Sequence, residues 1–279
     1  MTLTTTTANA VLTSDQIPQL VELPITRESA AMRTSTIVRT NAHQLKVPLL
    51  SADASTAGFP PEGAEAPIAE PTTTEAVVPL YKITALSVLT KELISDAEGD
   101  VLGLVGRSLV RSLITVIDNA AFANTTVDGF GGLGSITPTL ADAGADWTNY
   151  DTFEFAKSNA EQHGTVVSYW VCNPATALKL STVKAYAAAA SNIALLQPNS
   201  ADPAGRQISG IPLIVSPSVP NKTVWALPSD RIVTALRWGT TVESDGSVFF
   251  TSMKTALLAS VRLGYKVLDP LSLTKITVA

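Results

Sequence analysis

The chain has 279 residues and a mass of 29.2 kDa, enough to bury one sizeable core or to form two lobes. Hydrophobic residues make up 46% of it and charged residues only 15%, below the usual share of about 25%, so we expect other subunits to cover much of the surface. This composition, at a net charge of −5, argues against a disordered chain and against a dedicated nucleic-acid reader.

The sequence also argues against a secreted or membrane-spanning protein. Cys172 is the only cysteine, which excludes a disulfide scaffold and favours a reducing, cytosolic compartment. No apolar run reaches the roughly 18 residues that a membrane span needs. The threonine-rich start lacks the basic and apolar regions of a signal peptide.

The first predicted elements are short. Residues 1–14 are small, polar and uncharged, and we expect a flexible arm there. Apolar residues at near-helical spacing predict a helix over Asp15–Leu23, which Pro24 should end because proline cannot continue the hydrogen-bond ladder. Strands are expected over Thr36–Thr40 and Gln44–Leu50.

An acidic, proline-rich segment follows, from Pro48 to Leu80, without a lysine or arginine. It carries the whole charge imbalance, since setting its five acids aside leaves 19 of the 24, equal to the 19 bases. Two interpretations stay open: a solvated loop, or an arm that rests on another subunit. The five acids are Asp53, Glu62, Glu65, Glu70 and Glu75.

The middle of the chain predicts a long strand and a long helix. Strict alternation over Glu75–Leu89 indicates one strand, which leads into a helical segment near Thr90. Val101–Phe122 has the strongest helical pattern, and such a helix is roughly 30 Å long. Its predicted apolar face comprises Val101, Leu104, Val105, Leu109, Ser112, Leu113, Val116, Ile117 and Ala120, and its opposite face carries Arg107, Arg111 and Asp118.

The second half mixes short helices and strands. Asp151 and Glu154 form a capping-box-like start to a helix that ends at His163–Gly164. A buried strand is expected over Val166–Cys172, and Asn173–Pro174 should then open a helix through about Lys184. The absence of regular strand–helix alternation predicts the α+β class. Further strands are expected over Ile211–Ser216, Thr223–Leu227, Arg231–Trp238, Thr255–Lys266 and Leu273–Val278.

No motif indicates catalysis, a metal or a cofactor. The glycines of residues 129–134 match G-x-G-x-x-G but follow a helix, where a dinucleotide site needs a preceding strand. His43, His163 and Cys172 lack any short ligand spacing, and Cys172 lies in an apolar strand as an inert thiol. Nothing in the proline-rich loop would desolvate its acid pairs and shift their pKa values, which argues against general acid–base catalysis there. We therefore predict that the chain is not an enzyme.

A set of motifs in fixed order nonetheless points to a family. The motifs are Ile17–Glu22, Glu28–Arg33, Leu45–Pro48, Ala57–Ala64, Tyr81–Leu89, Lys91–Leu93, Ile117–Phe122, Asn173–Pro174, Gly210–Pro212 and Arg262–Tyr265. Together they resemble major capsid proteins of tailed bacteriophages with the HK97 fold, over residues 15–279.

The resemblance implies an L-shaped subunit that forms pentamers and hexamers of an icosahedral shell around double-stranded DNA. It implies localisation in the virion, assembly in the bacterial host cytoplasm, and portal, scaffolding and decoration proteins as partners, without a membrane. The packaged DNA would be held non-specifically. The implied parts are an N-terminal arm over 1–40, an extended hairpin loop over 41–79, a peripheral domain over 80–125 and 240–268, and an axial domain over 126–239 and 269–279.

The sequence departs from the founding member, which joins subunits by a lysine–asparagine isopeptide bond assisted by a glutamate. No lysine lies between Lys46 and Lys82. The resemblance implies that the asparagine and glutamate positions fall near Ser252 and Ala259, which lack both groups. We therefore expect no cross-links. We also expect no long scaffolding region before Ile17.

We expect inter-subunit contacts where the acidic loop of one subunit meets basic residues of a neighbouring subunit. Arg107 and Arg111 are the first candidates, although they are as readily explained as solvated residues; Arg27, Arg33 and Arg39 are the next. Phe59 is the expected apolar anchor. The candidate contact residues are Phe59, Glu62, Glu65, Glu70, Arg107 and Arg111.

Two rival functions remain. An encapsulin-type shell has the same fold but encloses a protein cargo, and the long proline-rich loop and N-terminal arm favour the phage interpretation over it. A hydrolase that uses Cys172 or an acid pair belongs to a different class, and would form a discrete small oligomer.

Overall fold

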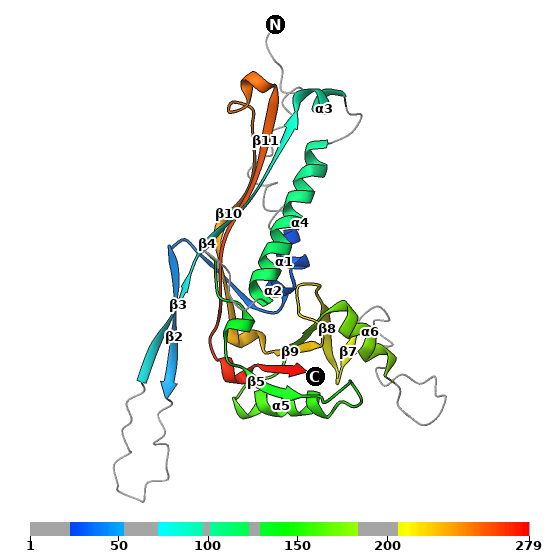
Figure 1. Ribbon diagram of the computed structural model, residues 1–279. Coiled ribbons are helices and arrows are strands. Elements are labelled where there is room, and N and C mark those ends of the chain that lie inside the picture. The colour runs from blue at the N-terminus through cyan, green and yellow to red at the C-terminus, as the bar shows by residue number, and fades with distance from the viewer. Residues whose placement is uncertain (1–22, 53–71, 97–100, 123–128, 184–205, 279) are drawn as a thin grey trace, which may run out of the picture.

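The computed structural model describes residues 23–52, 72–96, 101–122, 129–183 and 206–278. These residues form an upright rod, a rounded body below it, and a hairpin that diverges from the rod (Figure 1). Helices and strands are both present without a regular alternation, so the predicted α+β class is confirmed.

The rod is a four-stranded sheet in the order β1-β10-β11-β4. Strands β10 (Ile232–Asp245), β11 (Lys254–Val267) and β4 (Tyr81–Thr90) are antiparallel neighbours, and β1 (Thr36–Thr40) joins β10 in parallel. β10 is longer than predicted, because it continues past Trp238 through a register shift. α3 (Lys91–Asp96) follows β4, as expected.

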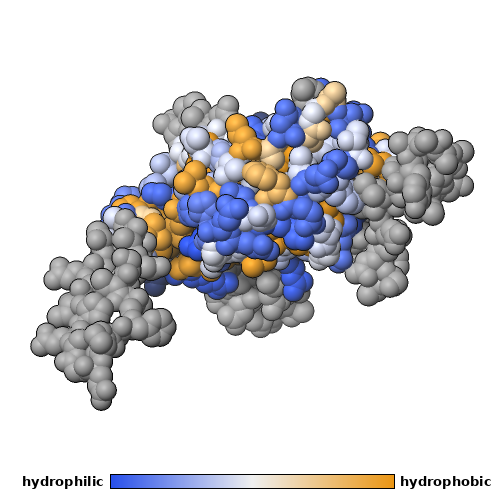
Figure 2. Space-filling model, turned by 90° about the horizontal axis from the view of Figure 1, so that it is seen from below, coloured by the Kyte–Doolittle hydropathy of each residue, from blue (hydrophilic) through white to orange (hydrophobic). Residues whose placement is uncertain are grey.

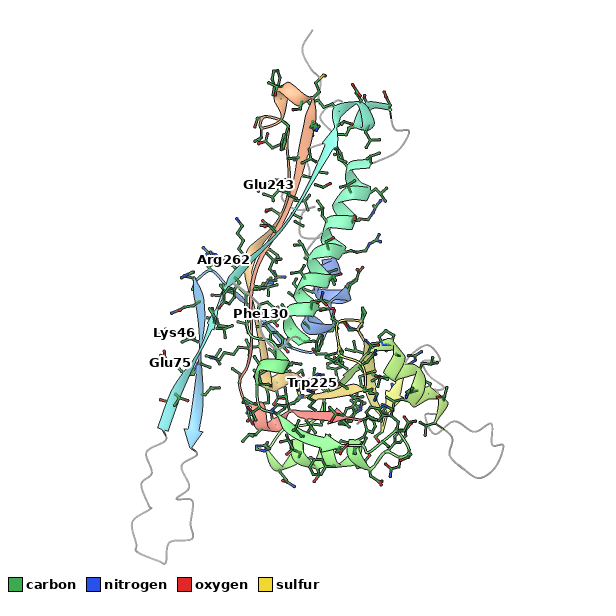
Figure 3. All side chains as sticks on the ribbon, in the orientation of Figure 1. Lys46, Glu75, Phe130, Trp225, Glu243 and Arg262 are labelled. Atoms are coloured by element: carbon green, nitrogen blue, oxygen red, sulfur yellow. The ribbon has the colours of Figure 1, made fainter. Side chains whose placement is uncertain are left out.

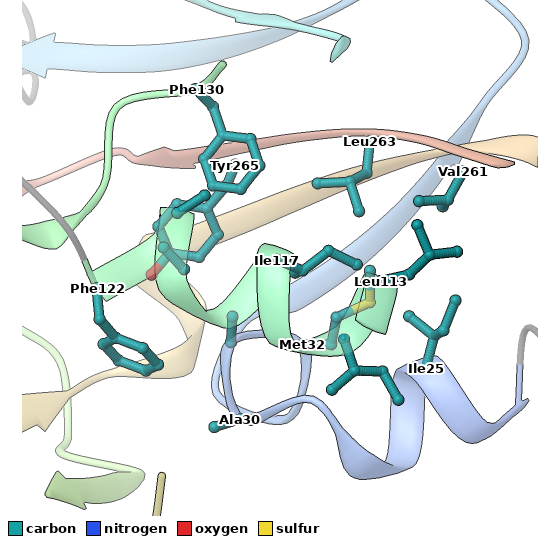
Figure 4. Packing of buried hydrophobic residues seen from close by; sticks show 14 of the residues in the cluster. Ile25, Ala30, Met32, Leu113, Ile117, Phe122, Phe130, Val261, Leu263 and Tyr265 are labelled. Atoms are coloured by element: carbon teal, nitrogen blue, oxygen red, sulfur yellow. The ribbon is translucent and has the colours of Figure 1, made fainter. Parts of the chain in front are cut away.

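Helix α4 (Val101–Phe122) covers one face of this sheet, and its predicted bounds are confirmed. Its buried side chains, such as Leu113 and Ile117, pack against Val261 and Leu263 of β11 (Figure 4). Leu104 and Val116 were expected in this core but are 58% and 47% exposed. The helical spacing places them at the margin of the apolar face, which the narrow sheet does not reach.

Two short helices near the N-terminus pack on α4. α1 (Leu23–Glu28) begins where the sequence predicted that a helix would end, because Pro24 lies in its first turn, where a missing N–H costs little. Residues 15–22 of the predicted helix lie outside the described part of the chain. α2 (Ala30–Arg33) follows directly and buries Met32 against α4 (Figure 4).

Asp118 was expected on the polar face of α4 but is 6% exposed, because α2 covers it. Its carboxylate accepts hydrogen bonds from the Ser29 hydroxyl at 2.6 Å and from the N–H groups of Ala30 and Ala31, each at 3.1 Å. Three donors satisfy the buried charge, so a helical-wheel position that looks solvent-facing is instead the attachment point of the N-terminal segment.

The body is a six-stranded sheet in the order β5-β12-β9-β6-β8-β7, with α5 and α6 on one face. Phe130 and Trp225 lie where the body meets the rod (Figure 3), inside the same buried cluster as α4. The body elements are β5 (Thr139–Asp142), α5 (Asp151–Gln162), β6 (Tyr169–Cys172), α6 (Pro174–Thr182), β7 (Gln207–Ile208), β8 (Ile211–Val215), β9 (Thr223–Leu227) and β12 (Thr274–Thr277). Single 3-10 turns are η3 (Leu133–Ser135), η4 (Ser229–Arg231), η5 (Phe250–Ser252) and η6 (Pro270–Ser272).

Some details of the body differ from expectation. Tyr150, not Asp151, is the N-cap of α5, and it makes no side-chain capping bond. β6 begins only at Tyr169, and Val166 is exposed before it. The Asn173 cap of α6 is confirmed, since its side-chain oxygen accepts from the N–H of Ala175 at 3.0 Å.

Candidate inter-subunit surfaces

The hairpin consists of β2 (Gln44–Ala52) and β3 (Thr72–Pro79), which pair only with each other. The single long strand predicted over Glu75–Leu89 is thus two strands of different sheets, separated at Leu80. Alternation does not mark where a strand leaves one sheet for another, so the pattern could not reveal this break.

The base of the hairpin rests on the sheet face opposite α4. Val78 and Leu80 are buried there against Ala235 of β10, with Leu45 and Val47 of the hairpin packed around them. Because α4 occupies the other face, the hairpin leaves the rod on the side that α4 does not cover (Figure 1).

Close backbone contact fixes this base. A Cβ atom at Gly264 of β11 would collide with the carbonyl oxygen of Pro79, so only glycine permits the approach. The Lys266 ammonium donates to the carbonyl oxygen of Val77 at 3.0 Å. Arg262 Nη2 donates to Nδ1 of His43, in the turn before β2, at 2.7 Å.

Further along the hairpin, Lys46 and Glu75 form an exposed ion pair at 2.9 Å (Figure 3). Such a pair stabilises the hairpin little. The predicted contact residues of the loop lie outside the described residues; they are Phe59, Glu62, Glu65 and Glu70.

Arg107 and Arg111 lie one turn apart on the exposed side of α4. Their exposure agrees with the expected availability for a partner, but no described acidic side chain of the same chain forms an ion pair with either. Since α4 and the hairpin base occupy opposite faces of the sheet, the structure does not bring these arginines and the hairpin together within one subunit.

A basic row that the sequence pattern did not predict lies on the other face of the sheet. Arg237 of β10 is directly opposite Arg262 of β11, and Arg262 is directly opposite Lys82 of β4. Side chains that are opposite one another across neighbouring strands point to the same face, so the row crosses three strands beside the hairpin base. The strand register, which sequence periodicity does not supply, is what reveals it.

The far end of the rod carries exposed apolar side chains in the β10–β11 turn. Val248 and Phe250 are 74% and 73% exposed. Met253 adopts the left-handed conformation with φ 51°, and the turn is anchored to α3 because the Met253 carbonyl oxygen accepts from the N–H of Lys91 at 2.9 Å. The Lys91 ammonium lies 5.8 Å from the Phe250 ring centroid.

The described part of the chain shows none of the usual signs of a catalytic or metal-binding site. Within it there is no group of three potential metal ligands and no helix long and apolar enough to span a membrane. Cys172 is fully buried, and burial raises the pKa of its thiol to about 12, so it is the inert thiol that the sequence predicted. His163 caps the end of α5.

Figure 2 shows the molecule from below. Hydrophilic and hydrophobic residues are interspersed over the face shown in Figure 2. Single exposed apolar side chains of this kind are normal for a protein surface.

A model of the phage capsid family matches residues 9–278. The chain belongs to the phage capsid family. As a phage major capsid protein it is a structural component of the virion and not an enzyme, as predicted. A search of curated proteins finds no significant match.

Solved structures confirm the capsid fold. A chain of Microbacterium phage Oxtober96 is 17% identical with a TM-score of 0.70, covering 90% of this chain and 91% of that one. The capsid of an empty GTA particle is 16% identical with a TM-score of 0.71, covering 100% and 95%. A chain of Mycobacterium phage Bobi is 12% identical with a TM-score of 0.70, covering 90% of each.

Proposed function

We propose that this capsid protein assembles as pentamers and hexamers into an icosahedral shell around double-stranded phage DNA, in the cytoplasm of the bacterial host. Portal, scaffolding and decoration proteins would complete the particle. The division into an arm over 1–40, a hairpin over 41–79, a peripheral domain over 80–125 and 240–268, and an axial domain over 126–239 and 269–279 belongs to the same proposal.

The observation that carries this proposal is the hairpin β2–β3. Its two strands form a sheet of their own, and in the part of the chain that the structure describes the rod contacts this sheet only near its base. An isolated two-stranded hairpin is marginally stable in water. A hairpin of this length is therefore expected to gain its remaining contacts from a neighbouring subunit.

Repeated weak contacts would hold the shell without covalent bonds. The position expected for the cross-linking asparagine falls near Ser252, a residue that has no carboxamide to lose ammonia. The position expected for the glutamate falls near Ala259, which is buried in β11 between Val242 and Ala85 and has no group that could move a proton. Because the shell would be closed and symmetric, many interfaces of modest binding strength would act together to stabilise it.

Two basic surfaces could receive the acidic loop of a neighbour. One is the pair Arg107 and Arg111 on α4, and the other is the row on the opposite face of the sheet. Phe59 is the proposed apolar anchor in either arrangement, with Glu62, Glu65 and Glu70 as the charged partners.

Sedimentation velocity of the purified protein tests the assembly. We expect a fast-sedimenting particle tens of nanometres wide that contains nucleic acid. A chain that remained a monomer or a small oligomer under all assembly conditions would contradict the proposal. Particles that held a protein cargo and no nucleic acid would instead indicate an encapsulin-type shell.

A further inference from the structure

We propose that the two histidines of the chain make two joints of the subunit respond to pH in opposite directions. Acid loosens the joint between the hairpin and the rod, at His43, and tightens the joint between the rod and the body, at His163. The chain contains only these two histidines. An unperturbed histidine side chain changes its charge between about pH 5 and 8. The inference concerns the single subunit and does not depend on the proposed shell.

The hairpin joint lies between β1 and β2. His43 is the last residue before β2, and Arg262 Nη2 of β11 donates to its Nδ1 atom at 2.7 Å. A guanidinium group can only donate, so this nitrogen has to accept, which it does only while the imidazole is neutral. Protonation puts an N–H on both ring nitrogens and ends the contact. The contact therefore exists at neutral and alkaline pH and is lost in acid.

A protonated His43 would also be repelled by its surroundings. Arg237 of β10 and Lys82 of β4 lie opposite Arg262 on its two neighbouring strands, so a charged imidazole would add a fourth cation to three. None of these three forms an ion pair with a described acidic side chain. Because like charges repel at this spacing, acid favours separation of the hairpin base from the sheet.

The acids on this side of the molecule are distant from the hairpin joint. Glu75 is paired with Lys46 at 2.9 Å, and its register position on the hairpin is about 16 Å beyond His43. Glu243 lies about 13 Å along the rod from Arg262, and Figure 3 shows the two well apart. Neither carboxylate is placed to stabilise a charged imidazole at this joint.

Two further cations lie on the strands near the hairpin joint. The Lys266 ammonium donates to the carbonyl oxygen of Val77 on the hairpin. Arg39 of β1 is paired in register with Leu236, which belongs to the core under α4, so Arg39 points to the α4 side of the sheet. The charges that surround His43 are therefore mainly positive.

The body joint lies where the chain passes from the rod into the body. His163 is the C-cap of α5, and Asp269 lies between β11 and η6. One carboxylate oxygen of Asp269 accepts from the N–H of Leu271 at 3.2 Å, and the other lies 3.8 Å from Nδ1 of His163. This distance is too long for a hydrogen bond from a neutral imidazole, whereas a protonated imidazole is attracted to the carboxylate.

Acid therefore adds an ion pair at the body joint, at a helix C-terminus that itself favours a cation. Arg231 also reaches this joint: its Nη2 donates to the carbonyl oxygen of His163 at 3.3 Å, and its Nε lies 3.4 Å from the Asp230 carboxylate. Because Arg231 and Asp230 pair with each other, Asp269 remains as the partner of a protonated His163. The ion pair is present in acid and is lost as the pH rises.

The other charged residues on the elements around His163 point elsewhere. Glu161 is exposed two residues earlier on α5, and residues two apart in a helix do not face each other. Lys275 of β12 and Asp142 of β5 alternate with residues that are buried under α5, so they point to the other face of the body sheet. The charge of His163 is thus felt mainly by Asp269.

Both effects are modest and opposite in sign. His43 is exposed and His163 is half-buried, and contacts of this kind change an equilibrium by about two- to fivefold. A general effect of acid on stability would shift both joints in the same direction. The opposite signs therefore distinguish the two histidines from general acid destabilisation.

Hydrogen–deuterium exchange of the folded full chain, compared at about pH 8 and about pH 5.5, tests the inference. Each rate is corrected for the intrinsic pH dependence of amide exchange. Peptides from β2 and β3 report on the hairpin joint, and peptides from the end of α5 and from η6 report on the body joint. On acidification we expect exchange to rise about two- to fivefold at the hairpin joint and to fall by a similar factor at the body joint.

Substitutions separate the two joints. His43→Asn keeps an uncharged acceptor at every pH, and His163→Asn keeps an uncharged side chain, so each should abolish the response of its own joint and leave the other joint unchanged. Each variant is therefore the matched control of the other. His163→Lys places a permanent cation near Asp269 and should keep the body joint protected at both pH values, whereas His43→Lys should leave the hairpin joint loose at both.

Other results would overturn the inference. Exchange that does not depend on pH at either joint would do so, as would a response that persists where the histidine has been replaced. A shift of both joints in the same direction would also contradict it. Since the measurement needs only a folded chain, its outcome is independent of whether the chain assembles, and failure of assembly would count against the proposed function alone.

Discussion

Gly264 lies where the hairpin base crosses the sheet, and its lack of a side chain is required there. In Gly264→Ala the new methyl group would meet the carbonyl oxygen of Pro79 and the side chain of Val78. We expect a loss of about 1–3 kcal/mol in the free energy of unfolding, as overpacking costs in a tight core. Urea unfolding of dissociated subunits measures it.

The matched control is Gly106→Ala in α4, where a Cβ atom has nothing within 4 Å. There alanine should raise the free energy of unfolding by about 0.5–1 kcal/mol, because glycine is a poor helix former. Equal effects of the two substitutions would show that close packing at Gly264 does not position the hairpin.

The reactivity of the Cys172 thiol reports on the packing of the body. Because burial raises the pKa of its thiol from 9.0 to about 12, the folded state favours the neutral form. Its contribution to stability is therefore complete below about pH 9 and is lost as the pH rises toward 12. Iodoacetamide at pH 8 should label Cys172 only after denaturation; labelling of the native protein would contradict the buried position.

Among the elements, the N-terminal helices depend on one carboxylate of α4. Asp118→Asn keeps the size of the side chain but removes its charge and one acceptor oxygen, while three donors still face it. We expect unfolding to become easier by about 1–3 kcal/mol. Proteolysis should also cleave the segment around α1 and α2 faster.

The neighbouring residue supplies the control for this change. Asn119 is exposed on α4, so Asn119→Ala should alter the free energy of unfolding by no more than about 0.5 kcal/mol. A comparable loss in both variants would show that Asp118 is not a specific attachment point.

The spacing of apolar residues along the sequence predicted individual helices and strands well. It predicted poorly how these elements pack against one another within the chain. The bounds of α4 follow from its apolar spacing, and the alternating burial of β4 matches its sequence pattern. The break at Leu80 and the burial of Asp118 depend on segments that are distant in sequence, which periodicity does not contain.

The candidate surfaces illustrate the same limit. Composition identified the acidic loop and the resemblance implied a hairpin, but the basic row arises only when β4, β10 and β11 are placed in register. Lys82 and Arg262 are 180 positions apart, so no local pattern could connect them. Arg107 and Arg111 were found because they lie one turn apart on one helix.

For the whole molecule, the proposed assembly without cross-links makes a direct prediction. Because the positions expected for the cross-linking groups fall near Ser252 and Ala259, a boiled and denatured particle should run as one band near 29.2 kDa. The position of the band on a denaturing gel measures this, and a ladder of covalent oligomers would refute it.

The central claim is that the chain completes its structure only as part of a closed shell. A cryo-electron microscopy reconstruction of purified particles tests it most directly. We predict an icosahedral shell in which the β2–β3 hairpin of each subunit lies against a neighbouring subunit. A discrete small oligomer, or a hairpin folded back onto its own subunit, would contradict the account.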